Sequence, residues 1–496
     1  MQYRWTRIFL ATVIILLLTT MCSKEPANQS EEVILATVAD KTISVSEFKY
    51  RAELIPRPPI FKDKEITLSN LIAEKLVAMD AGQNNELVKN ENFQAFVQGI
   101  QEQAMRDQLY YLEAKNKAKV DTSEMMQVYD ASRYNYKVAF YTITNDETAK
   151  RLKAKLEADS TNRAEIFDQI GEGMQVPIHD VKFKDPDNDF IHDALYSKPL
   201  KVDEVLGPIK LDNDQHIIMK IEDWTFHPVI GFEDQQLRLK DVENKILEKR
   251  SNKLWRSFIA DVMKGKKLDF VNDTFLKMAD ISFSMFLKSQ AKADSLNQNE
   301  PVQDNTDMLV QDLRDDSALL DYPFFSIDDK VWTVRDFKKA LASHPLVYRN
   351  TQFKNKTEYF DQFKYAIADL VRDQYLNKEA YGRHLQNHNY VKRRVSMWKD
   401  ASIAHFQVEH YIDQVAKRPD FDRARLKGSN NYLVSYIDSL ATVHKKDIHV
   451  DKVLLDDIVL TKTDMMALQE NVPYEAVVPS FPQYVVKKEL GLESKE

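Results

Sequence analysis

The sequence predicts a mainly α-helical protein with one α+β insert, organised as two helical modules of which the first is interrupted. Three observations lead to this prediction. Apolar residues recur at helical spacing over much of the chain, a pattern near its start returns later, and a β-rich stretch separates two parts of the first copy. Only 10 glycines and 29% charged residues among 496 are typical of long, solvated, amphipathic helices.

The N-terminal end has the layout of a secretory signal. Arg4 and Arg7 precede a largely apolar run over residues 8–18, and the chain turns polar directly after Cys22. A positive start, a short apolar run and a polar continuation are typical of exported precursors. The run is also shorter than the ~20 residues that span a bilayer. We therefore expect this chain to be exported from the cytoplasm.

The only cysteine marks the expected cleavage point. The run Leu-Thr-Thr-Met-Cys resembles the lipobox of bacterial lipoproteins, with Met21 where Gly, Ala or Ser is usual. The resemblance implies a signal peptide over 1–21, a lipid on Cys22 and a polar tether over 22–34. It places the protein on the periplasmic face of a bacterial envelope membrane, by preference the outer one, because Ser23 and not Asp follows the cysteine. The alternative is an ordinary signal or an uncleaved anchor with an incidental thiol.

Composition limits the remaining possibilities. The mature chain of about 475 residues (496 − 21) is too long for one core and predicts two to four domains. With a single cysteine there is no intramolecular disulfide, so the fold depends on apolar burial. The net charge of −8 argues against nucleic acid as the main partner.

Two segments share an opening pattern. Residues 39–56 align without a gap to residues 328–345, an offset of 289 (329 − 40 for matched aspartates). In the first copy Ser44 and Glu47 form a capping box, which satisfies free N–H groups at a helix start, and flanking apolar residues form a hydrophobic staple. Each copy should thus open with a short β segment, a capped helix and a proline stop. The second copy repeats the device with Thr333, Asp336, Trp332 and Phe337.

Amphipathic helices should follow each opening, and one long helix is expected over residues 388–416. A second matched pair closes each copy: residues 258–276 align to 436–454, an offset of 178 (447 − 269). The two offsets differ by 111 (289 − 178), which is the surplus of the first copy, best placed within 135–225. The apolar residues expected on shared helix faces are Ile72, Leu76 and Met79, then Phe93, Phe96, Val97, Ile100 and Ala104, and later Ile367, Leu370 and Val371.

The surplus segment has a pattern of its own. It predicts a strand over 136–144, three helices, and two strands over 205–210 and 215–224. This order describes an α/β module about the size of a small domain. The module should therefore be an insertion between helices that otherwise pack together.

The insert resembles a parvulin-type peptidyl-prolyl isomerase domain. Val-Leu-Gly-Pro-Ile-Lys followed by Gln-His-Ile-Ile-Met-Lys-Ile is similar to the closing strands of that family, and Asp-Phe-Ile-His-Asp-Ala-Leu-Tyr-Ser is similar to its Phe-x-x-Ala-Phe helix. The flanking copies resemble the helical N-terminal chaperone domain of SurA and PrsA, which a parvulin domain interrupts in the same way. The resemblance covers residues 35–281; over 319–463 it depends on the internal repeat.

The resemblance implies three site residues. His216 matches the last-strand histidine, Phe190 matches the aromatic residue that grips the proline ring, and Tyr141 stands with Phe140 where a first-strand histidine is usual. The family's Gly-Gly-Asp-Leu-Gly loop is missing, so the hypothesis is a retained fold with weak or lost activity. The alternatives are a strand histidine bonded to a neighbour for His216 and core packing for Phe190. The implied chemistry needs no cofactor and no metal ion.

The preferred hypothesis is an envelope folding factor whose helical modules bind unfolded secreted or outer-membrane chains. One alternative is a chaperone without catalysis, and another is a scaffold lipoprotein with one dedicated partner. Charge-dense helices such as residues 241–253 are interpreted as solvated faces.

The expected domains are a signal (1–21), a tether (22–34), the first module (35–134 with 226–281), the parvulin-like insert (135–225), a linker (282–318), the second module (319–463) and a C-terminal tail (464–496).

Overall fold

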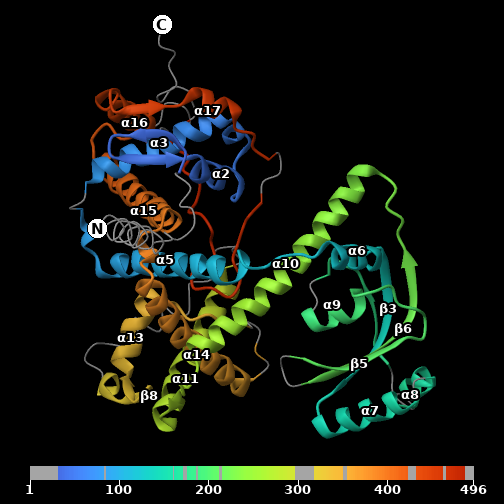
Figure 1. Cartoon of the computed structure of the whole chain (residues 1–496). Coiled ribbons are helices and arrows are strands. Elements are labelled where there is room, and N and C mark those ends of the chain that lie inside the picture. Colours follow the sequence, from blue (N-terminus) through green and yellow to red (C-terminus); the bar gives the residue numbers. More distant parts are fainter. Residues whose placement is uncertain are drawn as a thin grey trace, which may run out of the picture. The chain divides into compact units, whose positions relative to one another are not determined.

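The computed structural model describes residues 32–485, apart from 83–84, 160, 171–175, 186–187, 212–214, 297–317, 350–352, 354, 423–431 and 462–464 (Figure 1). The predicted signal peptide, Cys22 and nearly all of the predicted tether lie outside the described residues. Within the described part, no helix combines the length and the apolarity needed to cross a membrane. The chain forms two compact units: residues 1–109 with 262–496 (unit 1) and residues 110–261 (unit 2).

The predicted fold class is confirmed in its coarse form, because long helices dominate and the sheets are small and antiparallel. Unit 1 opens with β1 (Ile34–Val38), β2 (Lys41–Ser44) and α2 (Val45–Glu53), and the same order returns in β8 (Pro323–Ile327), β9 (Lys330–Thr333) and α13 (Val334–Ser343). The two hairpins have equal registers, since Val38 pairs with Lys41 and Ile327 pairs with Lys330. Both positions are shifted by 289 (327 − 38 and 330 − 41).

The helix caps follow the predicted pattern with one difference. Thr333 and Asp336 form the complete capping box at α13. At α2 the Ser44 hydroxyl accepts from the Glu47 N–H, but the Glu47 carboxylate lies 2.9 Å from Lys75 Nζ. The buried ammonium of Lys75 therefore takes the acceptor that the capping box would have used, because a buried charge is stabilised only when it is closely paired and hydrogen-bonded.

The two closing strands are exchanged between the openings. Strand β10 (Ile448–Val450), from the end of the second copy, pairs antiparallel with β1, and β7 (Asp269–Phe270), from the end of the first copy, pairs with β8. The sheets are consequently ordered β10-β1-β2 and β7-β8-β9. The prediction that residues 226–281 complete the module begun at residue 35 is therefore wrong.

The exchange extends to the hydrophobic cores. The first core joins β1, β2 and α3 (Lys64–Ala81) to α15 (Asn389–Ala416), α16 (Tyr432–Val443) and α17 (Lys452–Asp457). The second core joins α11 (Asn272–Leu296) to β8, α13 and α14 (Lys356–Gly382). Each core thus contains the opening of one copy and the closing of the other. Helix α15 matches the long helix predicted over 388–416.

Strand pairing also corrects the offset of the closing segments. Val450 occupies beside β1 the place that Phe270 occupies beside β8, an offset of 180 (450 − 270) where the alignment predicts 178. A shift of two residues keeps every strand side chain on the same face. The alternating pattern is therefore compatible with both offsets, and only the hydrogen-bonded register separates them.

Further segments join the two cores. In α5 (Glu91–Tyr110), Arg106 Nε lies 3.2 Å from the Asp373 carboxylate of α14, and His344 Nε2 lies 3.0 Å from the same group. Burial opposes the charge on Asp373, but Arg106, His344 and Arg372 outweigh it and lower its pKa. The remaining short helices of unit 1 are η1 (Pro59–Lys62), α4 (Glu86–Lys89), η3 (Ala318–Asp321) and η4 (Leu385–Asn387).

Two expected boundaries in unit 1 differ from the observed ones. The predicted linker begins inside α11, where Ser282, Met285 and Phe286 are buried in or beside the second core. The predicted C-terminal tail packs on the first core: Phe481 lies against Phe61, with ring centroids 5.6 Å apart. Residues 486–496 lie outside the described part.

Unit 2 is built on a four-stranded antiparallel sheet in the order β4-β3-β6-β5. Its strands are β3 (Tyr134–Ile143), β4 (Ile178–Val181), β5 (Val205–Lys210) and β6 (His216–Phe226). One face packs on α6 (Thr122–Ala131), α9 (Asp189–Tyr196) and α10 (Phe232–Val262); the other packs on α7 (Asp146–Ala158) and α8 (Arg163–Ile170) (Figure 1). A π-helical turn (Tyr111–Lys115) precedes α6.

The sequence predicts this order of elements except for β4. The compact unit is wider than the predicted 135–225, since it includes α6 and α10. Ala131, Val242 and Ile246 bury apolar surface against the sheet, and this packing draws both helices into unit 2.

Engineered disulfides can test the strand exchange. In a Cys22→Ser background, we expect the pair Thr37→Cys/His449→Cys and the pair Asp269→Cys/Ser326→Cys to oxidise readily. Both pairs face each other across neighbouring strands, where Cα atoms lie ~4.5–5.5 Å apart. The measurement is mass spectrometry of peptides digested without reduction.

The matched control is Thr37→Cys/Asp269→Cys, which would crosslink only in a module that keeps its own closing strand. Efficient oxidation of this control, with no crosslink in the first two pairs, would contradict the exchanged topology.

Candidate functional site

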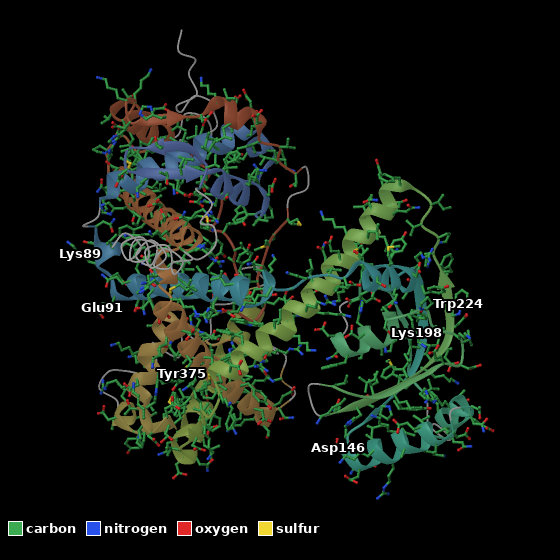
Figure 2. All side chains as sticks on the ribbon, in the orientation of Figure 1. Lys89, Glu91, Asp146, Lys198, Trp224 and Tyr375 are labelled. Atoms are coloured by element: carbon green, nitrogen blue, oxygen red, sulfur yellow. The ribbon has the colours of Figure 1, made fainter. Side chains whose placement is uncertain are left out.

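His216, the predicted isomerase histidine, is the first residue of β6. It pairs with Ile143 on β3 and with Lys210 on β5, and it is 8% exposed. Its Nε2 lies 3.4 Å from Asp146 Oδ1 at the start of α7 (Figure 2), while Nδ1 is buried with no hydrogen-bond partner among the described residues. His216 is thus a strand histidine held by one neighbouring carboxylate, as in the alternative interpretation.

Tyr141 lies on the same face of the sheet as His216. It pairs with Ile218, two positions along β6 from His216, and side chains two apart share a face. The Tyr141 ring packs on Phe167 of α8 with centroids 4.7 Å apart. Burial raises the pKa of the Tyr141 hydroxyl, which has no hydrogen-bond partner among the described residues. On the side toward α8, Phe167 therefore lies where a proline ring stacked on Tyr141 would need room.

Phe190 is not part of that face. It is the second residue of α9, which packs on the opposite side of the sheet through Leu195 and Tyr196, and it is 41% exposed. The structure brings His216 and Tyr141 together but leaves Phe190 outside their site. The resemblance matches each residue to a motif, whereas the side of the sheet on which α9 packs is a tertiary property.

Phe190 lines a different cavity of about 610 Å³, which we call the α9–α10 groove. Its apolar wall includes Val128, Phe190, Tyr196 and Ile246, contributed by α6, α9 and α10. A cavity of this volume is in the range of ligand-binding pockets. The cations that line it are Lys245, Lys249, Arg250, Lys253 and Arg256, and the carboxylates are Glu124, Asp189 and Asp193.

A buried histidine fixes one of these cations. His192 is 1% exposed, and its Nε2 donates to the Phe183 carbonyl at 3.0 Å, because a carbonyl can only accept. The Nδ1 lone pair therefore accepts from Lys249 Nζ at 2.7 Å, and the same ammonium also binds Asp193. Burial, and next the positive charge of Lys249, lower the pKa of His192 to about 4. A neutral imidazole thus orients a lysine at the groove.

The cations of the groove were not predicted as site residues from the sequence. Lys245, Lys249 and Lys253 follow each other at four-residue intervals, which places them on one side of α10. The charge-dense pattern predicts a solvated face, and part of it instead lines a cavity. The four-residue spacing of these lysines indicates a shared helix face. Only the packing of α9 beside α10 makes that face line a cavity.

Unit 2 also presents an exposed aromatic patch, defined by Trp224, Phe226, Ile230, Phe232 and Leu237. These residues run from the end of β6 into the start of α10, and Trp224 is labelled in Figure 2. Ile230 is 85% exposed and Phe232 is 75% exposed. Tyr134 supports the patch from β3, with its ring 5.1 Å from both Trp224 and Phe226. Several large apolar side chains exposed along one short stretch of chain are candidates for an interaction surface.

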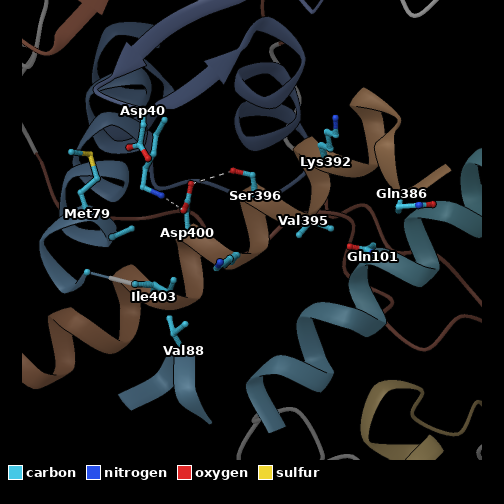
Figure 3. A pocket seen from close by; sticks show the side chains of 14 residues that line it. Asp40, Met79, Val88, Gln101, Gln386, Lys392, Val395, Ser396, Asp400 and Ile403 are labelled. Carbon is cyan, nitrogen blue, oxygen red and sulfur yellow. Dashed lines mark hydrogen bonds and ion pairs between the residues drawn. The ribbon is translucent and has the colours of Figure 1, made fainter. Parts of the chain in front are cut away.

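Unit 1 contains a second hollow, of about 520 Å³, among α3, α5 and α15 (Figure 3). Its deepest charged group is Asp400, whose carboxylate binds Lys41 at 2.6 Å, Lys75 at 3.0 Å and Ser396 at 3.4 Å. Burial opposes charge on Asp400, but Lys75 and Lys41 prevail and keep its pKa below the usual value. Both oxygens are engaged, so this carboxylate holds the fold and is not available to a ligand.

Unit 1 has an exposed apolar surface too, formed by the segment from α16 to the C-terminal stretch. Its members are mainly aliphatic or thioether side chains, which adapt to partners of different shape. They are Val443, Val453, Val459, Met465, Met466 and Leu468. Among the described residues, no group of three or more His, Cys, Asp and Glu side chains is placed to hold a metal ion.

The environment of His192 makes a testable prediction. We expect the Hε1 resonance of His192 to titrate with a midpoint of about 4, against about 6.5 for an ordinary histidine. Between these two values the unfolded chain binds a proton that the folded chain does not. The stability of unit 2 should therefore fall as the pH drops from about 6.5 to about 4.

A pH series of proton NMR spectra measures the midpoint, and His192→Gln identifies the resonance among the 11 histidines. A midpoint near 6.5 would contradict the buried, neutral imidazole.

No family model matches the chain, and no curated protein matches it. It is similar to solved structures of the foldase protein PrsA from Streptococcus pneumoniae (15% identity, covering 43% of this chain and 85% of that chain, TM-score 0.19) and of the peptidylprolyl isomerase PrsA from Bacillus cereus (15%, 46% and 93%, TM-score 0.18). A third is the foldase protein PrsA from Lactococcus lactis (14%, 47% and 92%, TM-score 0.15). TM-scores this low do not establish a common fold.

Proposed function

We propose that this chain is a folding factor of the bacterial cell envelope that binds unfolded or extended stretches of secreted or outer-membrane proteins. A lipid on Cys22 would hold it at the periplasmic face of a membrane, by preference the outer one. The observation that carries the proposal is the aromatic patch of unit 2.

The patch has the properties of a site for unfolded chains. Its side chains are large, mostly aromatic and exposed, whereas a folded protein normally buries such groups. Unfolded chains expose apolar side chains, so burying them against the patch releases water from both surfaces. An exposed cluster without a deep, shaped cavity favours many client sequences over one ligand.

The apolar surface of unit 1 supports the same function. Val459 is 83% exposed and Met466 is 65% exposed, and neither belongs to the aromatic patch. Two weak contacts on one long client reinforce each other, because binding at the first raises the local concentration at the second. Such a protein can hold extended polypeptides without a tight site for any single sequence.

We further propose that prolyl isomerisation by unit 2 is weak or absent. Rotation about the peptide bond faces a barrier of ~18–20 kcal/mol, and lowering it requires a pocket that receives the proline ring. Phe167 occupies the space beside Tyr141, and Phe190 lies on the other side of the sheet from His216. The α/β unit is then a binding arm that keeps the architecture of an isomerase domain.

The aromatic patch gives the main test. We expect Ile230→Ser/Phe232→Ser to reduce the suppression of aggregation of several unrelated, chemically unfolded clients, because two exposed apolar contacts are lost. Light scattering during dilution from denaturant measures the effect. Each contact contributes about 1 kcal/mol, so the loss of both, about 2 kcal/mol, should raise the half-effective concentration roughly thirtyfold.

The matched control is Val331→Ser, which removes a 56% exposed apolar side chain from β9 in unit 1, outside both surfaces. Equal activity of the double variant and the wild type would contradict the role of the patch. Tight binding to one folded protein, without any effect on unfolded clients, would favour the scaffold function.

Isomerase activity can be measured with a protease-coupled assay on Xaa-Pro peptides. We expect turnover close to the uncatalysed rate and no change on His216→Ala, because Phe167 packs on Tyr141 and Phe190 lies on the other side of the sheet from His216. Rapid turnover that His216→Ala abolishes would prove this part of the proposal wrong, while leaving polypeptide binding intact.

A further inference from the structure

We propose that the α9–α10 groove binds extended polypeptide segments of one kind. These segments carry acidic side chains at every second position and an aromatic or large apolar residue next to them. The proposal rests on the proposed polypeptide-binding function and specifies, for this groove, the chemistry of the segment.

The charge of the groove selects acidic partners. Five cations and three carboxylates line it, which leaves a balance of +2 (5 − 3), with His192 neutral. The whole chain carries −8, so this concave region has the opposite sign to the protein as a whole. Carboxylates are attracted to such a region, and basic segments are repelled from it.

The cations differ in their availability. Lys249 is held by His192 and Asp193, Arg250 pairs with Glu124, and Arg256 lies 3.7 Å from Asp189. Lys253, in contrast, is exposed and has no ion pair among the described residues. Lys245 lies 3.5 Å from Glu248, so four of the five cations are partly neutralised by a carboxylate. Lys253 is the cation that we expect to bind an incoming carboxylate.

The spacing of the cations matches an extended chain. Residues four apart on a helix rise by ~6 Å, and same-face side chains of an extended peptide repeat every ~6.6–6.8 Å. A segment with acidic residues at alternate positions therefore has nearly the same repeat as Lys245, Lys249 and Lys253 along α10. Its carboxylate at Lys253 meets the one lysine of the three that has no ion pair among the described residues.

An apolar floor accompanies the charged wall. Tyr196 and Ile246 are buried at the groove, whereas Phe190 stands exposed at its edge. An aromatic or large apolar side chain of the segment can lie against Phe190 and shield it from water. The combination of an exposed ring and a cationic stripe distinguishes this groove from the aromatic patch, which begins roughly 30 Å away along α10 if Phe232 and Lys253 are compared.

Fluorescence anisotropy with the full chain tests the proposal. The probes are a short labelled peptide with one Phe and alternating Asp residues, and its isosteric Asn version. We expect the Asp peptide to bind more tightly at low salt and to lose this advantage at high salt.

Lys253→Ala should weaken binding of the Asp peptide about two- to fivefold and leave the Asn peptide unchanged. Phe190→Ala should weaken both peptides by about fivefold or more. The matched control is Lys240→Ala, which removes an exposed lysine of α10 outside the groove.

Equal affinity for the Asp and Asn peptides would overturn the proposal, as would equal losses from Lys253→Ala and Lys240→Ala. Displacement of the Asp peptide by a short single-stranded RNA at equal concentration would show a general polyanion site and also overturn it. If any of these results is obtained while the wild type still suppresses client aggregation, the proposed function stands. If the wild type does not suppress client aggregation, the proposed function itself is wrong.

Discussion

The antiparallel pairing of β1 with β10, and of β8 with β7, is the constraint on which the architecture of unit 1 depends. These ladders are short, yet each fixes the position of the neighbouring helices in the sequence. Helices α16 and α17 flank β10, and α11 follows β7. The two cores then form between parts of different copies. The buried ion network reinforces the first core, because Lys75 of α3 is neutralised by Glu47 of the first copy and by Asp400 of the second. An unpaired charge at this depth would be strongly destabilising.

Unit 2 shows how one sheet can carry different surfaces on its two faces. The face toward α7 and α8 contains two of the three residues that resemblance assigns to isomerase chemistry, His216 and Tyr141, and Phe167 packs on Tyr141. The other face supports α9 and α10, which form the groove and lead to the aromatic patch. In the proposed function, polypeptides are thus recognised by the groove and the aromatic patch and not by the face that carries His216 and Tyr141.

Local patterns predicted the local structures well. Ser44 caps α2 and Thr333 caps α13, and α15 extends over the residues that its apolar spacing indicates. The exchange of closing strands could not be predicted, because β7 and β10 come from matched segments of the sequence. By their pattern alone, each of them could pair with either hairpin. The site was predicted only in part for a similar reason: motif matching identifies Phe190 but not the side of the sheet on which α9 packs. The His192–Lys249 contact depends on two helices that are 57 positions apart in sequence.

The strand exchange has a consequence for the order in which the protein itself can fold. Phe270 and Phe325 are 55 positions apart (325 − 270), whereas Ala36 and Val450 are 414 apart (450 − 36). Contacts between distant positions form slowly, because loop closure costs entropy before the contact stabilises anything. As the chain emerges from its N-terminal end, the second core can close early, while the opening hairpin of the first remains without its third strand until residue 450 arrives. During most of its synthesis the chain therefore carries an unpaired β-strand edge, the same hazard that the proposed function would control in other proteins.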